Sequence, residues 1–314
     1  MKKLISIVIP TYNEEANIIE LSKQVEFHIN NYNHINNYNY ELIFIDNCST
    51  DNTQEIIRRL CLQNKKIKAI FNNRNFGYVR SPYYGILQAQ GDAVLQINAD
   101  FQDPPELIPQ LINKWEKGSK VVFLKRISTN ENFILQFIKK IFYSFINLIS
   151  EIKLQKNVTG SGIYDKKIVL ELKKMNDPYP YMRGLILEIV DKVDVLEFHQ
   201  PKRNYGISKS TFYILFDYAM LGIIKHSKIP LRIMTISGFL MSFLSFLIGI
   251  FFLFYKFFYW DSFQLGLAPL VLGLFFGISV LIFMLGIIGE YVGLILTQVR
   301  NQPLVSEKER INFD

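Results

Sequence analysis

The sequence predicts an α/β fold, a domain with a mostly parallel sheet followed by two long helices that pair as a transmembrane hairpin. Three observations lead to this prediction. Short apolar runs rich in β-branched residues alternate with helix-patterned segments through residues 4–124, which is typical of βαβ units. Polar clusters follow several of these runs, and two long charge-free stretches lie near the C-terminus.

The elements of the first domain follow from periodicity and from flanking residues. Strands are expected at residues 4–9, 41–45, 68–71, 93–97 and 120–124, where the apolar runs are short. Helices are expected at residues 14–30, 53–63, 83–90 and 106–117, where apolar residues recur at helical spacing. We expect Asp51 or Asn52 to cap the second helix, Gly91 to end the third, and Asp165 to cap a later helix at 166–174.

Two stretches without a single charge are long enough to cross a bilayer. Residues 233–255 comprise 23 uncharged residues, and residues 262–289 comprise 28. At a rise of about 1.5 Å per residue, each helix spans a hydrocarbon core of roughly 30 Å. Lys225, Lys228 and Arg232 precede the first stretch and Arg300 follows the second. The positive-inside rule therefore places both termini and the α/β domain in the cytoplasm.

Two further segments are amphipathic. Residues 130–153 carry a broad apolar face, so this segment is either a helix packed on the sheet or a helix lying on the membrane surface. Residues 211–229 lead into the first charge-free stretch. The predicted organisation is an α/β domain at 1–210, an amphipathic juxtamembrane helix at 211–229, spans at 230–258 and 262–290, and a cytoplasmic tail at 291–314.

Composition excludes several classes of protein. The chain has 314 residues, of which 49% are hydrophobic, and its mean hydropathy is +0.14, which excludes a disordered chain and is unusual for a soluble domain. Two cysteines, Cys48 and Cys61, do not suit a disulfide-stapled secreted scaffold. The net charge is +7, but basic residues gather beside the charge-free stretches, so we expect no nucleic-acid partner.

Polar clusters follow the first, second and fourth expected strands. Because parallel strands end at one edge of a sheet, these clusters should meet there. Asp100 and Gln102 offer the hard oxygen ligands that Mg²⁺ or Mn²⁺ prefers when it bridges a diphosphate. Asp46 can accept hydrogen bonds from a base or ribose, and Tyr12 and Glu14 follow the first strand. Each cluster alone also fits a turn or a helix cap, but three at successive strand ends favour a ligand site.

The order of these motifs resembles that of family 2 glycosyltransferases, which have the Rossmann-like GT-A fold. The motifs are IVIPTYNE at 7–14, DNCSTD at 46–51, RNFG at 74–77, GD at 91–92 and ADFQDPPE at 99–106. Further on, RNYGISK at 203–209, PLR at 230–232, GEY at 289–291 and Pro303 resemble the polyisoprenyl-phosphate branch of the family. The whole chain is thus similar to bacterial enzymes that load a sugar onto undecaprenyl phosphate and to dolichol-phosphate mannose synthase.

The resemblance implies roles for individual residues. The nucleotide would be bound by Pro10, Tyr12, Glu14, Asp46, Asn98 and Ala99. Asp100 and Gln102 would hold Mg²⁺ or Mn²⁺, and Arg126 would contact a phosphate near the reaction centre. Arg203 and Lys209 would close over the phosphate of the donor or of the lipid, although each of these cations also fits a solvated surface charge. The implied catalytic residues are Asp100, Arg126, Arg203 and Lys209.

Three positions depart from the family pattern. Asn98 stands where the family usually has the first aspartate of its D-x-D motif, and Asn47 replaces a second aspartate. Gly160, aligned from Asp165 without gaps, stands where relatives carry an acidic residue often proposed as the base. A lipid phosphate has a second pKa of about 6 and is largely ionised at neutral pH. Its attack therefore needs no general base.

The resemblance implies an inverting glycosyltransferase of the inner membrane, a multi-pass protein with its catalytic domain in the cytoplasm. It would move a sugar from a nucleotide sugar, a UDP-sugar such as UDP-glucose, to undecaprenyl phosphate. The product would serve as a donor for modification of cell-envelope glycans, and a homo-oligomer such as a tetramer is compatible with this role. Two alternatives remain: an inactive membrane scaffold, favoured by the missing acidic residues, and a processive polysaccharide synthase, disfavoured by the presence of only two spans.

Overall fold

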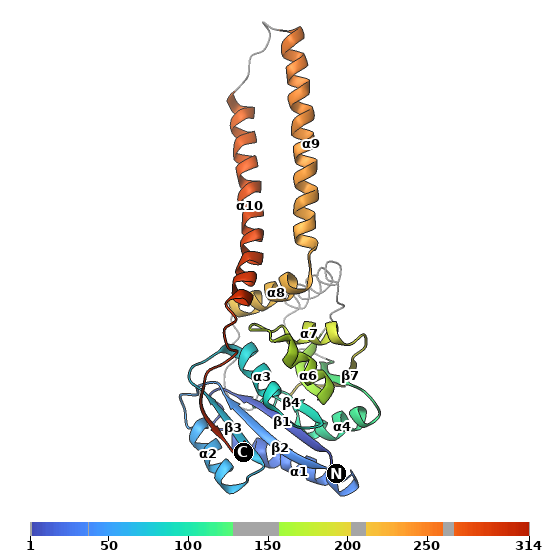
Figure 1. Ribbon diagram of the computed structural model, residues 1–314, viewed down its shortest axis with the longest axis vertical. Helices are drawn as coiled ribbons and strands as arrows, with labels where there is room; N and C mark the ends of the chain where they lie inside the picture. Colours follow the sequence, from blue (N-terminus) through green and yellow to red (C-terminus); the bar gives the residue numbers. More distant parts are fainter. Residues whose placement is uncertain (1, 37, 128–156, 202–211, 260–266, 314) are drawn as a thin grey trace.

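The computed structural model describes residues 2–36, 38–127, 157–201, 212–259 and 267–313. An α/β domain lies at one end, and two long helices extend from it side by side (Figure 1). The segment at 130–153 and the motif at 203–209, with Arg203 and Lys209, lie outside the described residues.

Within the described residues, eight strands form one sheet in the order β7-β5-β6-β4-β1-β2-β3-β8. They are β1 (Leu4–Thr11), β2 (Asn39–Asp46), β3 (Ile67–Asn72), β4 (Ala93–Gln96), β5 (Val121–Arg126), β6 (Val158–Asp165), β7 (Asp194–Phe198) and β8 (Glu307–Ile311). Of these, β6 and β8 run antiparallel to their neighbours and the other pairings are parallel. The predicted mostly parallel sheet is confirmed.

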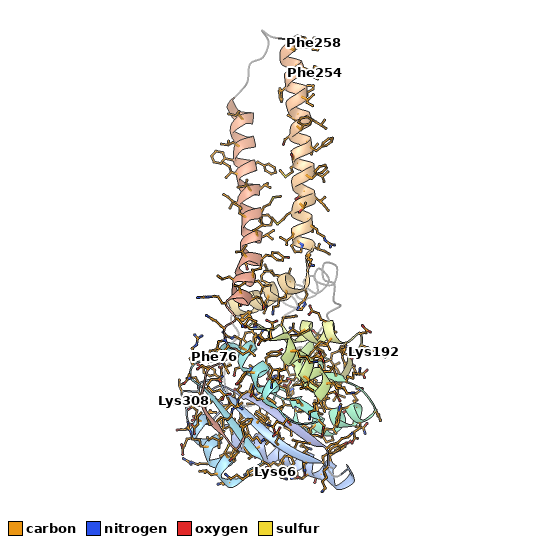
Figure 2. All side chains as sticks on the ribbon, viewed as in Figure 1. Lys66, Phe76, Lys192, Phe254, Phe258 and Lys308 are labelled. Atoms are coloured by element: carbon orange, nitrogen blue, oxygen red, sulfur yellow. The ribbon has the colours of Figure 1, made fainter. Side chains whose placement is uncertain are left out.

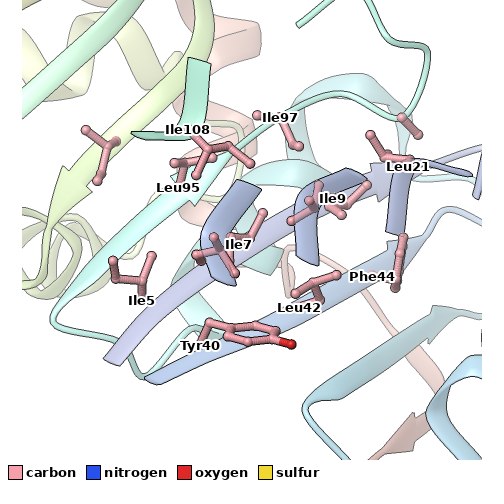
Figure 3. Packing of buried hydrophobic residues seen from close by; sticks show 14 of the residues in the cluster. Ile5, Ile7, Ile9, Leu21, Tyr40, Leu42, Phe44, Leu95, Ile97 and Ile108 are labelled. Atoms are coloured by element: carbon pink, nitrogen blue, oxygen red, sulfur yellow. The ribbon is translucent and has the colours of Figure 1, made fainter. Parts of the chain in front are cut away.

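Helices cover both faces of this sheet. One face carries α1 (Ile18–Asn36), α2 (Thr53–Gln63) and, after a short helical turn at Pro105–Leu107, α4 (Ile108–Glu116). The other carries α3 (Gly77–Gln88), α6 (Lys166–Met175) and α7 (Met182–Ile189). In β1, Ile7 and Ile9 point to the first layer, where Figure 3 shows them near Leu42 and Phe44, while Val8 points to the second. Burial on both faces explains why the strands read as continuous apolar runs.

The predicted strands are present, but three helices have different bounds. The first runs on to Asn36, and the fourth, expected at 106–117, is a short helical turn followed by a helix at Ile108–Glu116. The first begins at Ile18 because residues 14–17 form a turn, in which the Ile18 amide donates to Glu14 O at 3.2 Å. The third begins at Gly77 and ends at Gln88, with Ala89 as its C-cap. Gly91, predicted to end this helix, instead packs so closely on β1 that an added Cβ would come within 2.6 Å of Ser6 Oγ.

One of the two predicted helix N-caps makes the expected side-chain hydrogen bond, and the other does not. Asp165 is the N-cap of α6, and its side chain accepts a hydrogen bond from the Lys167 amide, as predicted. At α2 the N-cap position is Asn52, whose side chain makes no capping bond. The Thr53 amide instead donates to Asp51 Oδ1 at 3.0 Å.

The C-terminal segment 291–314 differs from the predicted tail. The helix α10 (Leu267–Val299) includes the first part of this segment, and β8 pairs with β3 at the sheet edge (Figure 1). Arg58 contacts Glu309 at 2.7 Å, and Asn312 Nδ2 donates to Cys61 O at 2.9 Å. The strand escaped prediction because its sequence, EKERI, is mostly charged, a composition that suits an exposed edge strand but shows no apolar run.

The helix α8 (Phe212–His226) leads from the domain to the apolar extension. The extension consists of α9 (Ile229–Phe258) and α10. Among the described residues, two stretches are long and apolar enough to cross a membrane, Ile229–Phe252 and Gly273–Val299. In the most apolar window of either stretch no residue is buried, and the side chains drawn along both helices lie outside the α/β domain (Figure 2). These features are consistent with a membrane protein.

Candidate active site

The predicted site residues that the structure describes gather at one edge of the sheet. Thr11 is the register partner of Asp46, so β1 and β2 end side by side. The next strand, β4, ends just before Asn98, and β6 runs antiparallel to it, with Gly162 opposite Gln96. The loops after β1, β2 and β4 and the beginning of β6 therefore meet at one edge of the sheet, the edge at which ligands bind in parallel sheets.

The first two loops are bonded into one unit. The backbone amide of Asn13 donates to Ser49 Oγ at 2.8 Å, and that of Glu14 donates to Thr53 Oγ1 at 2.9 Å. In return, the Thr50 amide donates to Asn13 Oδ1 at 2.8 Å. Asn13 and Cys48 have φ values of 56° and 63°, in the left-handed region that tight turns use. This unit carries the half-buried side chains of the predicted nucleotide ligands Pro10, Tyr12 and Glu14.

Asp46 lies at the base of this unit. It is fully buried, and its Oδ2 accepts from the Ser49 amide at 3.0 Å and from Gln54 Nε2 at 2.7 Å. These bonds fix the shape of the loop that follows β2. Asp46 is thus placed where a nucleotide contact was predicted, but much of its hydrogen-bonding capacity is already directed to the loop.

Asn47 joins the loop after β2 to the loop after β3. Its Nδ2 donates to Asn75 Oδ1 at 2.9 Å and to Gly77 O at 3.2 Å. Its Oδ1 accepts from the Phe76 amide at 2.8 Å and from Asn72 Nδ2 at 3.3 Å. An aspartate here could accept the last two bonds but could not donate the first two. The amide at position 47 is therefore required by its surroundings.

The loop after β4 holds the predicted metal and diphosphate ligands. Asn98 and Gln102 are half-buried, whereas Ala99 and Asp100 are only 3% and 7% exposed. The Gln102 amide donates to Asp100 Oδ1 at 3.1 Å. Phe101, between them, has a φ of 58°. This turn brings the oxygen-bearing side chains of positions 98, 100 and 102 to one strand end.

Asp103 holds this loop in place through hydrogen bonds to Asn98 and Ser161. It is fully buried, and its Oδ2 accepts from the Asn98 amide at 3.2 Å, from Asn98 Nδ2 at 2.8 Å and from Ser161 Oγ at 2.5 Å. Burial raises the pKa of the Asp103 carboxyl, while the bonds from Ser161 and Asn98 oppose this shift. The Asn98 amide group is thus held by Asp103, which explains why a neutral donor stands where the family usually has aspartate.

Arg126 ends β5 beside this cluster. Its backbone amide donates to Asn157 O at 3.0 Å. Its side-chain Nε is buried and, within the part of the chain that the structure describes, has no hydrogen-bond partner. The positive charge of Arg126 lowers the pKa of Asp103, while the negative charge of Asp100 raises it. One cation and two carboxylates therefore share the site.

The segment around Gly160 carries no carboxylate that faces this cluster. A Cβ built on Gly160 would meet nothing within 4 Å. Asp165 is opposite Ala93, at the amino end of β4, so it lies at the far edge of the sheet from Asn98. Its Oδ2 accepts from Trp115 Nε1 at 2.9 Å. Asp165 is therefore a structural cap, as its position in the sequence indicated.

The donor set fits a hard divalent cation. Asp100 offers a carboxylate, and Asn98 and Gln102 offer amide oxygens, which suit Mg²⁺ or Mn²⁺ when phosphate oxygens and water supply the remaining ligands. Across the described ranges, no group of three or more His, Cys, Asp or Glu side chains could hold a metal on its own. The site thus suits an ion that arrives with a diphosphate.

Two residues of this cluster, Asp103 and Ser161, were not predicted from the sequence. Asp103 lies within the ADFQDPPE motif at 99–106, and Ser161 directly follows Gly160, but neither was expected to belong to the site. Their contact joins positions 58 apart in the sequence. The only local signal was the DPP sequence after Gln102, which reads as a turn.

Comparisons with known proteins place the chain in context. The family model described as glycosyl transferase family 2 matches residues 6–176. An uncharacterized glycosyltransferase of Synechocystis sp. is 34% identical over 96% of this chain and 93% of its own length. The SfII prophage-derived bactoprenol glucosyl transferase of Shigella flexneri is 31% identical over 95% of this chain and 96% of its own. A solved mycobacterial protein is 16% identical, with a TM-score of 0.49 over 71% of this chain and 73% of that one.

Proposed function

This chain belongs to glycosyl transferase family 2 and is a glycosyltransferase, and we propose that it transfers a sugar from a UDP-sugar, such as UDP-glucose, to undecaprenyl phosphate. The observation that carries the proposal is the Asn98–Asp103 loop, which presents oxygen ligands at a strand end beside Arg126. The bactoprenol glucosyl transferases, similar over nearly the whole chain, support a polyisoprenyl phosphate as acceptor.

Different residues bind different parts of the nucleotide sugar. Pro10, Tyr12, Glu14 and Asp46 bind the base and ribose in the unit formed by the first two loops. Asn98 and Ala99 approach the diphosphate, and Asp100 and Gln102 hold Mg²⁺ or Mn²⁺. When bound, this ion neutralises charge that builds on the departing diphosphate.

Transfer itself then depends on position and charge. The acceptor phosphate is largely ionised at neutral pH, so the protein needs to align its oxygen with the anomeric carbon and exclude water. Arg126, Arg203 and Lys209 stabilise phosphate charge as the bond to the diphosphate breaks. A single displacement inverts the anomeric centre, so an α-linked donor gives a β-linked lipid phosphosugar.

The same proposal includes an inner-membrane location. The first and last strands, β1 and β8, belong to one sheet, so both ends of the chain lie on the side of the catalytic domain. Lys228, Arg232 and Arg300 are exposed beside the two apolar helices, which favours the cytoplasmic side by the positive-inside rule. The hairpin keeps the site near the bilayer surface, where the headgroup of a long isoprenoid can reach it.

The acceptor is tested by comparing lipids that differ in one group. Full-length protein in lipid nanodiscs is given UDP-glucose and Mn²⁺ with either undecaprenyl phosphate or undecaprenol, and released UDP is measured. We expect release only with the phosphate. Equal release with both lipids, or none with any UDP-sugar tried, would contradict the proposal. A protein that binds UDP but never transfers would favour the inactive scaffold.

A further inference from the structure

We propose that Asp103 is a positioning residue of the transfer site, which holds Asn98 and Arg126 so that they face the donor diphosphate as one unit with Asp100. This inference rests on the proposed function, because it assigns Asp103 a task in binding the donor of that reaction. Asp103 itself is buried and does not touch the substrate. It acts through the two residues that it orients.

Asn98 is bonded twice to Asp103. Both its backbone amide and its Nδ2 donate to the same oxygen of Asp103, at 3.2 and 2.8 Å. Two bonds from one residue to one acceptor fix the backbone and the side chain together. With its amide nitrogen held in this way, Asn98 turns its Oδ1 away from the carboxylate. This leaves Asn98 Oδ1, a neutral oxygen, two positions before Asp100 in the same loop.

These bonds all go to Asp103 Oδ2, and the other carboxylate oxygen, Oδ1, is not used by them. Asp103 Oδ1 is buried and, among the described residues, accepts no hydrogen bond. Arg126 Nε is likewise buried and, over the same part of the chain, donates none. One atom is an acceptor on an anion and the other a donor on a cation, and Arg126 ends the strand β5 that pairs with β6, the strand from which Ser161 bonds Asp103. An uncompensated buried charge is costly, so the charge of Asp103 and the opposite charge of Arg126 stabilise each other.

Ser161, on the neighbouring strand β6, holds Asp103 in place. Ser161 Oγ donates to Asp103 Oδ2 at 2.5 Å from β6, and β6 is hydrogen-bonded to both β4 and β5. Asp103 therefore connects the loop after β4, which carries Asn98 and Asp100, to the strand beside Arg126. Removal of its charge should loosen both groups at once, and this is the property that an experiment can measure.

The test is a double-mutant cycle on donor binding. UDP binding is measured by calorimetry with Mn²⁺, without acceptor, for full-length wild type, Asp103→Asn, Arg126→Ala and the double variant. We expect Asp103→Asn to raise the dissociation constant of UDP about 10- to 100-fold, since charge-assisted contacts are lost. Arg126→Ala should cost about 10-fold in the wild type but less than about 3-fold when Asp103 is already replaced.

The matched control is Asp194→Asn. Asp194 also accepts a hydrogen bond from a serine, Ser119. It begins β7, whereas the far end of that strand is paired with Arg126. This variant should bind UDP within about 2-fold of wild type, as expected for an independent site. It reports what loss of a carboxylate–serine contact does to the fold alone.

Several results would overturn the inference. These are additive effects of the two substitutions, an unchanged UDP affinity in Asp103→Asn, or a loss in Asp194→Asn of equal size. If Asp103→Asn does not fold, Ser161→Ala removes one donor to the same carboxylate and should weaken UDP binding in the same direction by about 2- to 5-fold. Unchanged binding there would also overturn it.

Failure of the proposed function has a different signature. A wild-type protein that binds UDP but forms no lipid-linked sugar would contradict the acceptor assignment, while the binding cycle would still decide the role of Asp103. A wild-type protein without Mn²⁺-dependent UDP binding would overturn both.

Discussion

Lys225 and Asp177 form a buried ion pair that ties α8 to the catalytic domain, with each side chain only 7% exposed. Lys225 Nζ also donates to Tyr179 O at 2.6 Å. From the second apolar helix, Gln298 Nε2 donates to Asp177 Oδ1 at 3.1 Å. One carboxylate thus joins the helix before the first apolar stretch to the end of the second. Lys225 is committed to this joint rather than to lipid headgroups, although the sequence had placed it in a basic cluster beside the membrane.

Asp177→Asn is expected to destabilise this joint strongly. Loss of one partner from a buried pair leaves an uncompensated charge and costs about 3–5 kcal/mol. Thermal unfolding in detergent should therefore shift to lower temperature. The control is Glu171→Gln, which breaks an exposed pair with Lys174 (the side chains are 50% and 71% exposed) and should cost no more than about 1 kcal/mol. Equal shifts for the two variants would contradict a buried, shared joint.

His226, the next residue, should make the same region sensitive to acid. Burial is the main cause that lowers the pKa of His226, and Lys225 adds to it, whereas Glu188, with Oε1 2.7 Å from Nδ1, and Asp177 oppose the shift. The fold therefore favours neutral imidazole. Stability should be fully present above the unfolded pKa of about 6.5 and should fall as pH decreases below it toward the folded value.

The measurement compares melting temperatures of wild type and His226→Gln between about pH 7.5 and pH 5.5, the range in which histidine titrates. Wild type should lose more stability over this range than the variant. An identical loss in both proteins would show that other groups cause the acid sensitivity.

Asn47→Asp should weaken the nucleotide site although it restores the residue that is usual in the family. The carboxylate would face Asn75 Oδ1 and Gly77 O, to which the amide now donates. The loss of two donors should cost about 1–3 kcal/mol and raise the dissociation constant of UDP. Asn113→Asp, at an exposed position on α4, controls for the added charge. A gain in affinity in Asn47→Asp would refute the view that Asn47 joins the loops.

Asp165→Asn should retain activity within about 2-fold. Asparagine caps helices as well as aspartate does, and Asp165 lies at the opposite edge of the sheet from Asn98. A general base usually supplies about 10²–10⁴-fold in rate, so a loss of that size in a folded variant would identify Asp165 as the base. The pH–rate profile gives a second check. Its acid limb should remain near pH 6 in both proteins, because the lipid phosphate titrates there.

Local patterns predicted much of the fold but little of how the site is supported. Runs such as Ile5 to Ile9 identify strands because both faces are buried, and Asp165 identifies a cap because its bond to the Lys167 amide is local. The charged strand β8 carries no such pattern, since its pairing with β3 joins residues far apart in sequence. Asp103 was missed for the same reason. Its partner Ser161 and its burial come from the packing of β6 beside β4.

Sugar transfer to undecaprenyl phosphate is tested most directly by the mass of the lipid product. Full-length protein in nanodiscs that contain undecaprenyl phosphate is incubated with UDP-glucose and Mn²⁺, and the lipids are analysed by mass spectrometry. Wild type should convert undecaprenyl phosphate to a species heavier by one hexose residue, and Asp100→Ala should remain folded but lose this product, as should wild type in excess chelator. Undecaprenyl phosphate that stays unmodified with every nucleotide sugar tried, or full product formation by Asp100→Ala, would contradict the account.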